Sequence, residues 1–234
     1  RAESPGPSVG KLVPKVRHTA RILYIIYFGL TLLEFIILVM AKMPVFDAVN
    51  TSFATAGTGG FGIKNDSIAG YSPYIQYVVT IFMILFGINF NVYFLLLFKK
   101  PKQALKSEEA RYYLGIIAAV TALIVWNVRP MFETFAQALK HVAFQVASII
   151  TTTGFSTTNF DQWPEFSKGL LVALMFIGAC AGSTGGGIKV SRFVILFKTM
   201  KKEIQQIIHP RSIKVIRFEG KPVEHGVLRS INTC

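Results

Sequence analysis

The chain is poor in the residues that build disulfide frameworks and metal sites. It has only two cysteines, Cys180 within an apolar segment and Cys234 at the last position, so no disulfide framework is expected. Its four histidines are scattered and lack the spacing of metal ligands. Acidic residues are also few, 12 against 25 Lys and Arg, which gives a formal net charge of +13.

Charged residues are absent from long stretches of the chain. Residues 74–98 hold none over 25 positions and residues 169–188 hold none over 20, enough to span a hydrocarbon core of roughly 30 Å. Residues 22–41 carry Glu34 as their only charge, and residues 112–128 carry none. Together with a hydrophobic content of 52% and a mean hydropathy of +0.48, these runs predict an all-α protein that crosses a membrane several times.

The positive charge is concentrated in three segments. Residues 1–21 and 99–111 each hold five Lys or Arg, and residues 189–234 hold ten, whereas the connections 42–73 and 129–168 share five. Since cytoplasmic loops are enriched in Lys and Arg, the N-terminus, the middle loop and the C-terminal tail are predicted to be cytoplasmic. This alternation favours a membrane protein over a nucleic-acid-binding protein, the other class that a strongly basic charge indicates.

Two short segments carry nearly the same unusual pattern. Residues 58–62 read T-G-G-F-G and residues 152–156 read T-T-G-F-S, 94 positions apart. Both fit T-x-G-F-[G/S], a close variant of the T-V-G-Y-G loop whose backbone carbonyls bind K⁺ in potassium channels. Gly60 and Gly154 would permit a backbone conformation that other residues resist, so that carbonyls point toward one axis. Each segment lies between two apolar stretches, which predicts two filter loops inside the membrane.

The predicted filter residues offer backbone carbonyls to dehydrated K⁺, and the two phenylalanines pack behind the loops to hold their width. K⁺ is the only bound ion expected there, and no covalent cofactor is expected. These residues are Thr58, Gly59, Gly60, Phe61, Thr152, Thr153, Gly154 and Phe155.

Each filter pattern belongs to one M1-P-M2 unit, which is a helix, a re-entrant pore helix with its filter loop, and a second helix. The first repeat is predicted at 20–98, with helix 20–43, pore helix 44–56, filter loop 57–63 and helix 72–98. The second is predicted at 109–200, with helix 109–128, pore helix 131–150, filter loop 151–157 and a broken helix 168–200. Cytoplasmic segments are expected at 1–19, 99–108 and 201–234.

The last long apolar stretch is interrupted by glycine. Residues 178–187 read G-A-C-A-G-S-T-G-G-G. Each glycine in a helix costs about 1 kcal/mol relative to alanine, so three in succession are not expected to hold a helix. We therefore predict a loop directly beneath the filter.

The two repeats, the two filter patterns and residues 178–189 together resemble the Trk/Ktr/HKT superfamily of potassium transporters, and within it the bacterial TrkH type. In that superfamily four M1-P-M2 repeats surround one pore, and the two present here resemble the second and third. The chain has no initiator Met and no signal peptide, which is typical of a piece of a longer protein. The resemblance implies potassium uptake across the bacterial inner membrane, driven by the ion gradient and the membrane potential, without enzymatic activity.

The resemblance also implies how the pore is controlled. The glycine-rich loop of the third repeat acts as an intramembrane gate, and a cytosolic ring of nucleotide-binding TrkA-type subunits opens or closes it from the basic cytoplasmic face. The other implied partners are membrane lipid, the remaining pore repeats of the full-length chain and a second copy in a homodimer. Glycine at 60 and 154, where serine tends to admit Na⁺, favours K⁺. The gate residues would be Gly178, Ala179, Cys180, Ala181, Gly182, Ser183, Thr184, Gly185, Gly186, Gly187 and Lys189.

Two other functions are considered. A tandem-pore potassium channel, in which two such repeats per chain pair as a dimer, explains the number of repeats but not the glycine-rich loop. A membrane-embedded nucleotide-binding enzyme is suggested because residues 57–62 fit G-x-G-x-x-G and residues 182–189 resemble a phosphate-binding loop. The first motif lacks a preceding strand and a following acidic residue, and in the second Val190 replaces the Ser or Thr that would hold Mg²⁺.

Several residues allow a purely structural interpretation. The glycines of the filters and of the loop could serve close helix packing. Glu34, a charge within an apolar run, is either a functional group or a hydrogen-bonding partner of a neighbouring helix. Asn89 and Asn91 are expected to join helices rather than touch ions. Lys189 could impede K⁺ passage or extend toward the cytoplasm.

Overall fold

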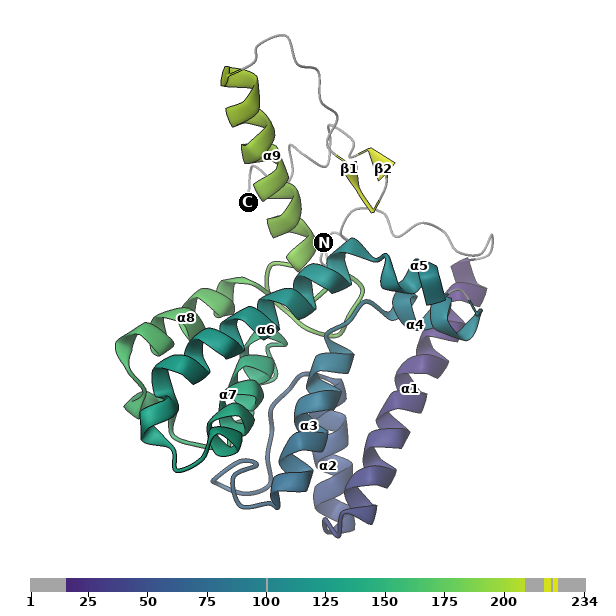
Figure 1. Ribbon diagram of the computed structural model, residues 1–234. Coiled ribbons are helices and arrows are strands. Elements are labelled where there is room, and N and C mark those ends of the chain that lie inside the picture. The colour runs from purple at the N-terminus through teal and green to yellow at the C-terminus, as the bar shows by residue number, and fades with distance from the viewer. Residues whose placement is uncertain (1–15, 100, 209–216, 220, 223–234) are drawn as a thin grey trace.

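The computed structural model describes residues 16–99, 101–208, 217–219 and 221–222. Its helices are α1 (Val16–Met40), α2 (Val45–Ala56), α3 (Pro73–Phe86), α4 (Phe90–Leu97), α5 (Pro101–Leu105), α6 (Glu108–Val128), α7 (Phe135–Ile150), α8 (Glu165–Phe176) and α9 (Val190–Ile208) (Figure 1). Two 3-10 turns, η1 (Arg129–Met131) and η2 (Phe160–Gln162), flank α7 and its following loop. A short antiparallel hairpin pairs β1 (Arg217–Phe218) with β2 (Lys221–Pro222). The predicted N-terminal segment up to residue 15 and most of the predicted tail, including Cys234, lie outside the described residues.

The helices form two units with the same order. In the first unit α1 and α2 are followed by a long loop and by α3 and α4, and in the second unit α6 and α7 are followed by a loop and by α8 and α9 (Figure 1). At a rise of 1.5 Å per residue, the 12 residues of α2 and the 16 of α7 are about 18 and 24 Å long, too short to cross a bilayer. Each returns through its filter loop, which confirms the predicted two-repeat architecture.

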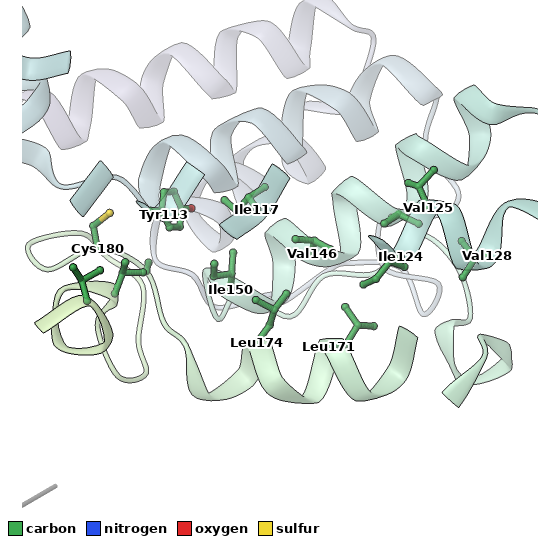
Figure 2. Packing of buried hydrophobic residues seen from close by; sticks show 14 of the residues in the cluster. Tyr113, Ile117, Ile124, Val125, Val128, Val146, Ile150, Leu171, Leu174 and Cys180 are labelled. Atoms are coloured by element: carbon green, nitrogen blue, oxygen red, sulfur yellow. The ribbon is translucent and has the colours of Figure 1, made fainter. Parts of the chain in front are cut away.

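The described residues form two apolar clusters, and one of them holds the second unit together. Side chains of α6, α7 and α8 face one another in this cluster (Figure 2): Tyr113, Ile117, Ile124, Val125, Val128, Val146, Ile150, Leu171 and Leu174. The other cluster joins α1, α2 and α3 and includes Phe144 and Ala147 of α7, because α3 packs against α7. In a membrane such close contact stabilises mainly through van der Waals packing.

Among the described residues, two helical segments are long and apolar enough to cross a membrane, Ala20–Met40 and Glu108–Met131, and α3 with α4 would make a third if counted as one bent span. Their outward faces carry large exposed apolar side chains, such as Tyr24 and Phe28 on α1 and Trp126 on α6. Such faces suit lipid rather than water. The last predicted span, the broken helix 168–200, is not one membrane-crossing helix, because residues 177–189 separate α8 from α9.

The predicted continuous helix over 72–98 is wrong. The stretch consists of α3 and α4, which are bent by 91° relative to each other at residues 87–89. Asn89 caps the start of α4, where its side-chain oxygen accepts a hydrogen bond from the backbone N–H of Asn91 at 2.9 Å. Gly87 ends α3 where Tyr113 approaches so closely that a Cβ atom would lie 2.1 Å from the tyrosine oxygen.

Smaller differences concern element boundaries. The second pore helix begins at Phe135 rather than at 131, because Thr134 caps it and residues 129–131 form η1. The predicted basic loop at 99–108 contains the short helix α5. The tail begins later than predicted, since α9 continues to Ile208.

Candidate ion pathway

The two filter loops repeat the same backbone conformation. Thr58 and Gly60 have φ values of 51° and 66°, and the equivalent Thr152 and Gly154 have φ values of 58° and 91°. The residue between each pair lies outside this left-handed region. Alternation between residues of positive and negative φ changes the direction of successive carbonyls, and potassium filters bind ions through rows of backbone carbonyl oxygens. The glycine conformation was expected, whereas nothing in the sequence indicated that the threonines would share it.

The two loops lie beside each other, although they are far apart in the sequence. A Cβ atom on Gly60 would lie 2.0 Å from the carbonyl oxygen of Thr153, so only glycine fits this approach. A Cβ atom on Gly154 would meet nothing within 4 Å. At Gly154 the second loop therefore borders open space, whereas at Thr153 it is covered by the first loop.

Hydrogen bonds fix the second filter loop on the end of α7. The backbone N–H groups of Thr153 and Gly154 donate to the carbonyl oxygen of Ser148 at 2.9 and 3.3 Å. The Ser148 hydroxyl donates to the carbonyl oxygen of Phe155 at 2.6 Å. The Thr151 hydroxyl lies 2.8 Å from that of Thr153 and donates to a carbonyl of its own helix. Ser148 was not singled out from the sequence. Its position, six residues before Gly154 and near the end of the pore helix, was the available signal for its role.

The first unit also supports the second filter. After its own filter the chain returns through a loop in which the Ser67 hydroxyl accepts a hydrogen bond from the backbone N–H of Ser156 at 3.2 Å. The backbone N–H of Ile68 donates to the carbonyl oxygen of Ser156 at 3.1 Å. This loop therefore joins the two repeats beside the filter.

The two filter phenylalanines differ in their surroundings. Phe155 is fully buried in the apolar cluster that includes α3, as predicted for a residue behind the filter. Phe61 is 80% exposed among the described residues, and its packing behind the first loop, which a neighbouring repeat would supply, stays a prediction. Its ring lies over Gly59, where a Cβ atom would be 3.1 Å from a ring carbon. α2 packs on α1 and α3 of its own unit, but no described helix of another unit packs on it as α3 of the first unit packs on α7. The cover that buries Phe155 is therefore missing at Phe61.

The glycine-rich loop, defined here as residues 177–189, lies against both filters. The backbone N–H of Gly186 donates to the hydroxyl of Thr152 at 2.8 Å, and the hydroxyl of Thr58 donates to the carbonyl of Thr184 at 3.3 Å. The ends of the loop meet at a bridge between Ile177 and Ile188. The loop is non-helical and next to the filter, as expected from its composition.

Lys189 folds back onto the same loop. Its ammonium group donates to the carbonyl oxygen of Gly185, and the side chain is half-buried. The glycines also allow close approach within the loop, since a Cβ atom on Gly178 would lie 2.2 Å from the carbonyl oxygen of Gly186. This close approach joins two parts of the same loop, whereas the structural interpretation of these glycines was close packing between helices.

The glycine-rich loop and the break between α3 and α4 satisfy each other's backbone groups. The N–H of Cys180 donates to the carbonyl of Gly87 at 3.0 Å, and the N–H of Phe90 donates to the carbonyl of Gly182 at 3.1 Å. A helix end leaves unpaired N–H and C=O groups that need such partners inside a membrane. The combination of Gly87 and Asn89 within an apolar run was the sequence signal for this break.

Two buried carboxylates lie near these elements. Glu34 is fully buried on α1 near Thr55 of α2, without a hydrogen bond of ordinary geometry among the described residues. Glu109, which sequence reasoning missed, accepts a hydrogen bond from the backbone N–H of Ala181 in the glycine-rich loop at 2.7 Å. Asn89 joins helices as expected, because its side-chain nitrogen donates to Glu109 at 3.4 Å.

The nucleotide-binding interpretation receives no support from the described residues. Residues 57–62 follow α2 rather than a strand and lead into an irregular loop rather than a helix. The described residues also contain no cluster of His, Cys, Asp or Glu suited to a metal ion. The geometry that remains is a pair of adjacent loops with the same backbone conformation, in contact with a third, glycine-rich loop.

Comparisons with known proteins agree with this geometry. The sequence matches the family described as "TrkH: Cation transport protein" over residues 1–131 and 119–232. The Trk system potassium uptake protein TrkH of Salmonella typhimurium is 35% identical over 238 residues, which cover 99% of this chain and 49% of that protein. The Trk system potassium uptake protein TrkG of Escherichia coli is 34% identical over 237 residues, which cover 99% of this chain and 48% of that protein.

A solved structure matches as well. The crystal structure of the potassium transporter TrkH from Vibrio parahaemolyticus superposes with a TM-score of 0.88 at 31% identity, covering 96% of this chain and 49% of that one. The chain thus spans about half the length of the relatives it matches. Since the family match extends over nearly the whole sequence, the chain belongs to the TrkH family of cation transport proteins.

Proposed function

We propose that this chain supplies two of the four pore repeats of a potassium uptake protein. The observation that carries the proposal is the pair of filter loops with the same alternating backbone conformation at Thr58, Gly60, Thr152 and Gly154. The names of the related proteins, Trk system potassium uptake proteins, support K⁺ as the transported ion.

In the proposed mechanism K⁺ exchanges its hydration shell for backbone carbonyls of the two loops and of their counterparts in the other two repeats. The negative ends of the α2 and α7 dipoles, which lead directly into the loops, favour a cation at this depth. Transport follows the ion gradient and the membrane potential and requires no covalent step.

The glycine-rich loop is proposed as the gate of this pathway. Its contacts with Thr152 and Thr58 support the proposal, because they hold it next to the filter. Passage of K⁺ would require the loop to move aside. Lys189, whose ammonium group is held within the loop, would leave the pathway with it.

The cellular setting follows from charge and exposure. We infer a bacterial inner-membrane protein whose basic segments before α1, around α5 and after α9 face the cytoplasm. Exposed apolar side chains such as Phe53 on α2 and Phe176 on α8 support further pore repeats, lipid and a second copy of the protein as neighbours. A cytosolic nucleotide-binding ring of the TrkA type would act on the loop from the basic face.

The proposal is tested with the full-length protein in bacteria that lack their own potassium uptake systems. The protein should restore growth at low external K⁺, and uptake should be faster for K⁺ than for Na⁺. Correctly inserted protein that restores neither growth nor K⁺ uptake would contradict the proposal.

A further inference from the structure

Glu109 is a buried carboxylate in the first turn of α6 that contacts the glycine-rich loop. Only 3% of the residue is exposed. One carboxylate oxygen accepts a hydrogen bond from the backbone N–H of Ala181 at 2.7 Å, and the other accepts one from the side-chain nitrogen of Asn89 at 3.4 Å. The group thereby joins α6, the break between α3 and α4, and the loop.

A carboxylate in such a place needs these partners. Burial of an ionised group is costly unless hydrogen bonds replace water, and hydrogen bonds to a charged acceptor are shorter and stronger than neutral ones. The first turn of a helix also favours negative charge. The short contact with Ala181 is therefore a strong attachment, whereas the contacts of the loop with Thr152, Thr58, Gly87 and Phe90 are hydrogen bonds between neutral groups.

The attachment lies at the centre of the loop's contact with the helix break. On either side of Ala181, Cys180 bonds to the carbonyl of Gly87 and Gly182 bonds to the N–H of Phe90. Loss of the Glu109 contact would thus loosen the segment in which the loop is bound to α3 and α4.

The same end of α6 contacts the C-terminal part of the chain. Glu108 forms an ion pair with Lys198 of α9. The carboxylate of Glu219, between β1 and β2, accepts hydrogen bonds from the hydroxyl of Ser107 at 3.0 Å and from the backbone N–H of Glu109 at 3.1 Å. A displacement of the segment that follows α9 would therefore act directly on the turn that carries Glu109.

We propose that Glu109 is a positioning residue, which holds the glycine-rich loop against the filter and releases it when the start of α6 moves. The proposal rests on the gating function proposed above. Specifically, the hydrogen bond from the Ala181 N–H to the Glu109 carboxylate sets the fraction of time that the loop spends against the filter.

Cys180 provides a native reporter for this equilibrium. It is fully buried within the loop and adjacent to Ala181. In the full-length protein with all other cysteines replaced, the rate of labelling by a small methanethiosulfonate reagent measures how often the loop leaves its site. Glu109→Ala should raise this rate at least about tenfold, the change expected when a hydrogen bond to a charged group is lost. K⁺ flux per folded molecule should rise with it.

Two further variants separate positioning from general destabilisation. Glu108→Ala removes a carboxylate from the same turn, but one that contacts Lys198 and Glu219 rather than the loop. It should therefore raise Cys180 labelling clearly less than Glu109→Ala does. Glu109→Gln keeps an acceptor oxygen for Ala181 without the charge, so its labelling rate should lie between those of the wild type and Glu109→Ala. If Glu109→Ala does not fold, Glu109→Gln alone tests the proposal by labelling faster than the wild type.

Wild-type labelling in folded Glu109→Gln and Glu109→Ala proteins would overturn the proposal, as would equal increases in the Glu108 and Glu109 variants. Faster labelling without faster K⁺ flux would support Glu109 as a positioning residue but contradict the gating function of the loop. The two proposals can therefore fail separately.

Discussion

At the scale of single residues, the two filter glycines share a backbone conformation but differ in their surroundings. Gly154 has a φ of 91° and open space where a side chain would begin. Gly60 has a φ of 66° and faces the carbonyl of Thr153. Substitution at Gly154 therefore costs backbone strain alone, whereas substitution at Gly60 adds a collision with another backbone.

Gly154→Ser in the full-length protein should weaken the selection of K⁺ over Na⁺ without preventing membrane insertion. Left-handed backbone costs a residue with a side chain about 1–2 kcal/mol, and about 1.4 kcal/mol corresponds to a factor of ten. We expect selectivity in a flux assay to fall by up to about thirtyfold, the factor that about 2 kcal/mol corresponds to. Gly169→Ser, in α8 and also facing open space, is the matched control and should keep wild-type selectivity.

Gly60→Ala should lower stability more than Gly154→Ala does. A Cβ atom 2.0 Å from the Thr153 carbonyl oxygen forces the two loops apart, and overpacking of this kind typically costs about 1–3 kcal/mol. Thermal unfolding of the full-length protein in detergent would measure this. Gly115→Ala, within α6 and without close neighbours, should be neutral or slightly stabilising. Equal melting temperatures for the Gly60 and Gly154 variants would disprove the contact between the loops.

At the scale of elements, the prominent feature is the pairing of two interrupted helices. The break between α8 and α9 was predictable because three successive glycines stand in an apolar stretch. The break between α3 and α4 was not predicted, since Gly87 and Asn89 within an uncharged run are also compatible with a continuous helix. Its cause is tertiary: the carbonyl of Gly87 and the N–H of Phe90 are bonded to the glycine-rich loop, about 90 residues away in sequence.

The same distinction applies to the candidate site. The filter residues could be located from a repeated local pattern, and the glycine-rich loop from composition. The exposure of Phe61 could not be predicted, because it depends on what packs beside α2. The contact between Glu109 and Ala181 could not be predicted either, because a Glu in the first turn of a helix is ordinary until a distant loop is placed against it.

Deletion of residues 182–187 should raise K⁺ flux through the full-length protein and remove the dependence on a cytosolic ring that we propose. The segment includes Thr184 and Gly186, which contact the filter threonines, so its removal would leave the pathway less obstructed. Flux should be normalised to correctly folded protein. If these glycines served helix packing alone, the deletion would lower both expression and flux, and a folded deletion variant that conducts no faster would contradict the gate.

At the scale of the whole molecule, the packing of one repeat on the next suggests how the pore is completed. α3 of the first unit packs against the pore helix α7 of the second. The pore helix α2 has exposed apolar side chains, including Phe46 and Phe53, in place of such a neighbour. Repeats placed by the same rule on both sides of these two would cover α2 and the outer face of α8.

Topology is a separate test of the whole-molecule account. Asn65 follows the first filter and Gln103 lies in α5, and both are exposed. Since the positive-inside rule puts α5 in the cytoplasm, Asn65→Cys should react with a membrane-impermeant thiol reagent on intact cells and Gln103→Cys should not. After permeabilisation both should react. Labelling of the cysteine at 103 alone on intact cells would invert the orientation.

The central claim is that the carbonyls of the two filter loops bind the transported ion. Anomalous X-ray scattering from crystals of the full-length protein grown with Tl⁺ in place of K⁺ tests it most directly. The account predicts peaks on one axis between the carbonyl oxygens of residues 58–60 and 152–154, and their weakening in Gly154→Ser. Tl⁺ bound only elsewhere, in protein shown to transport K⁺, would contradict it.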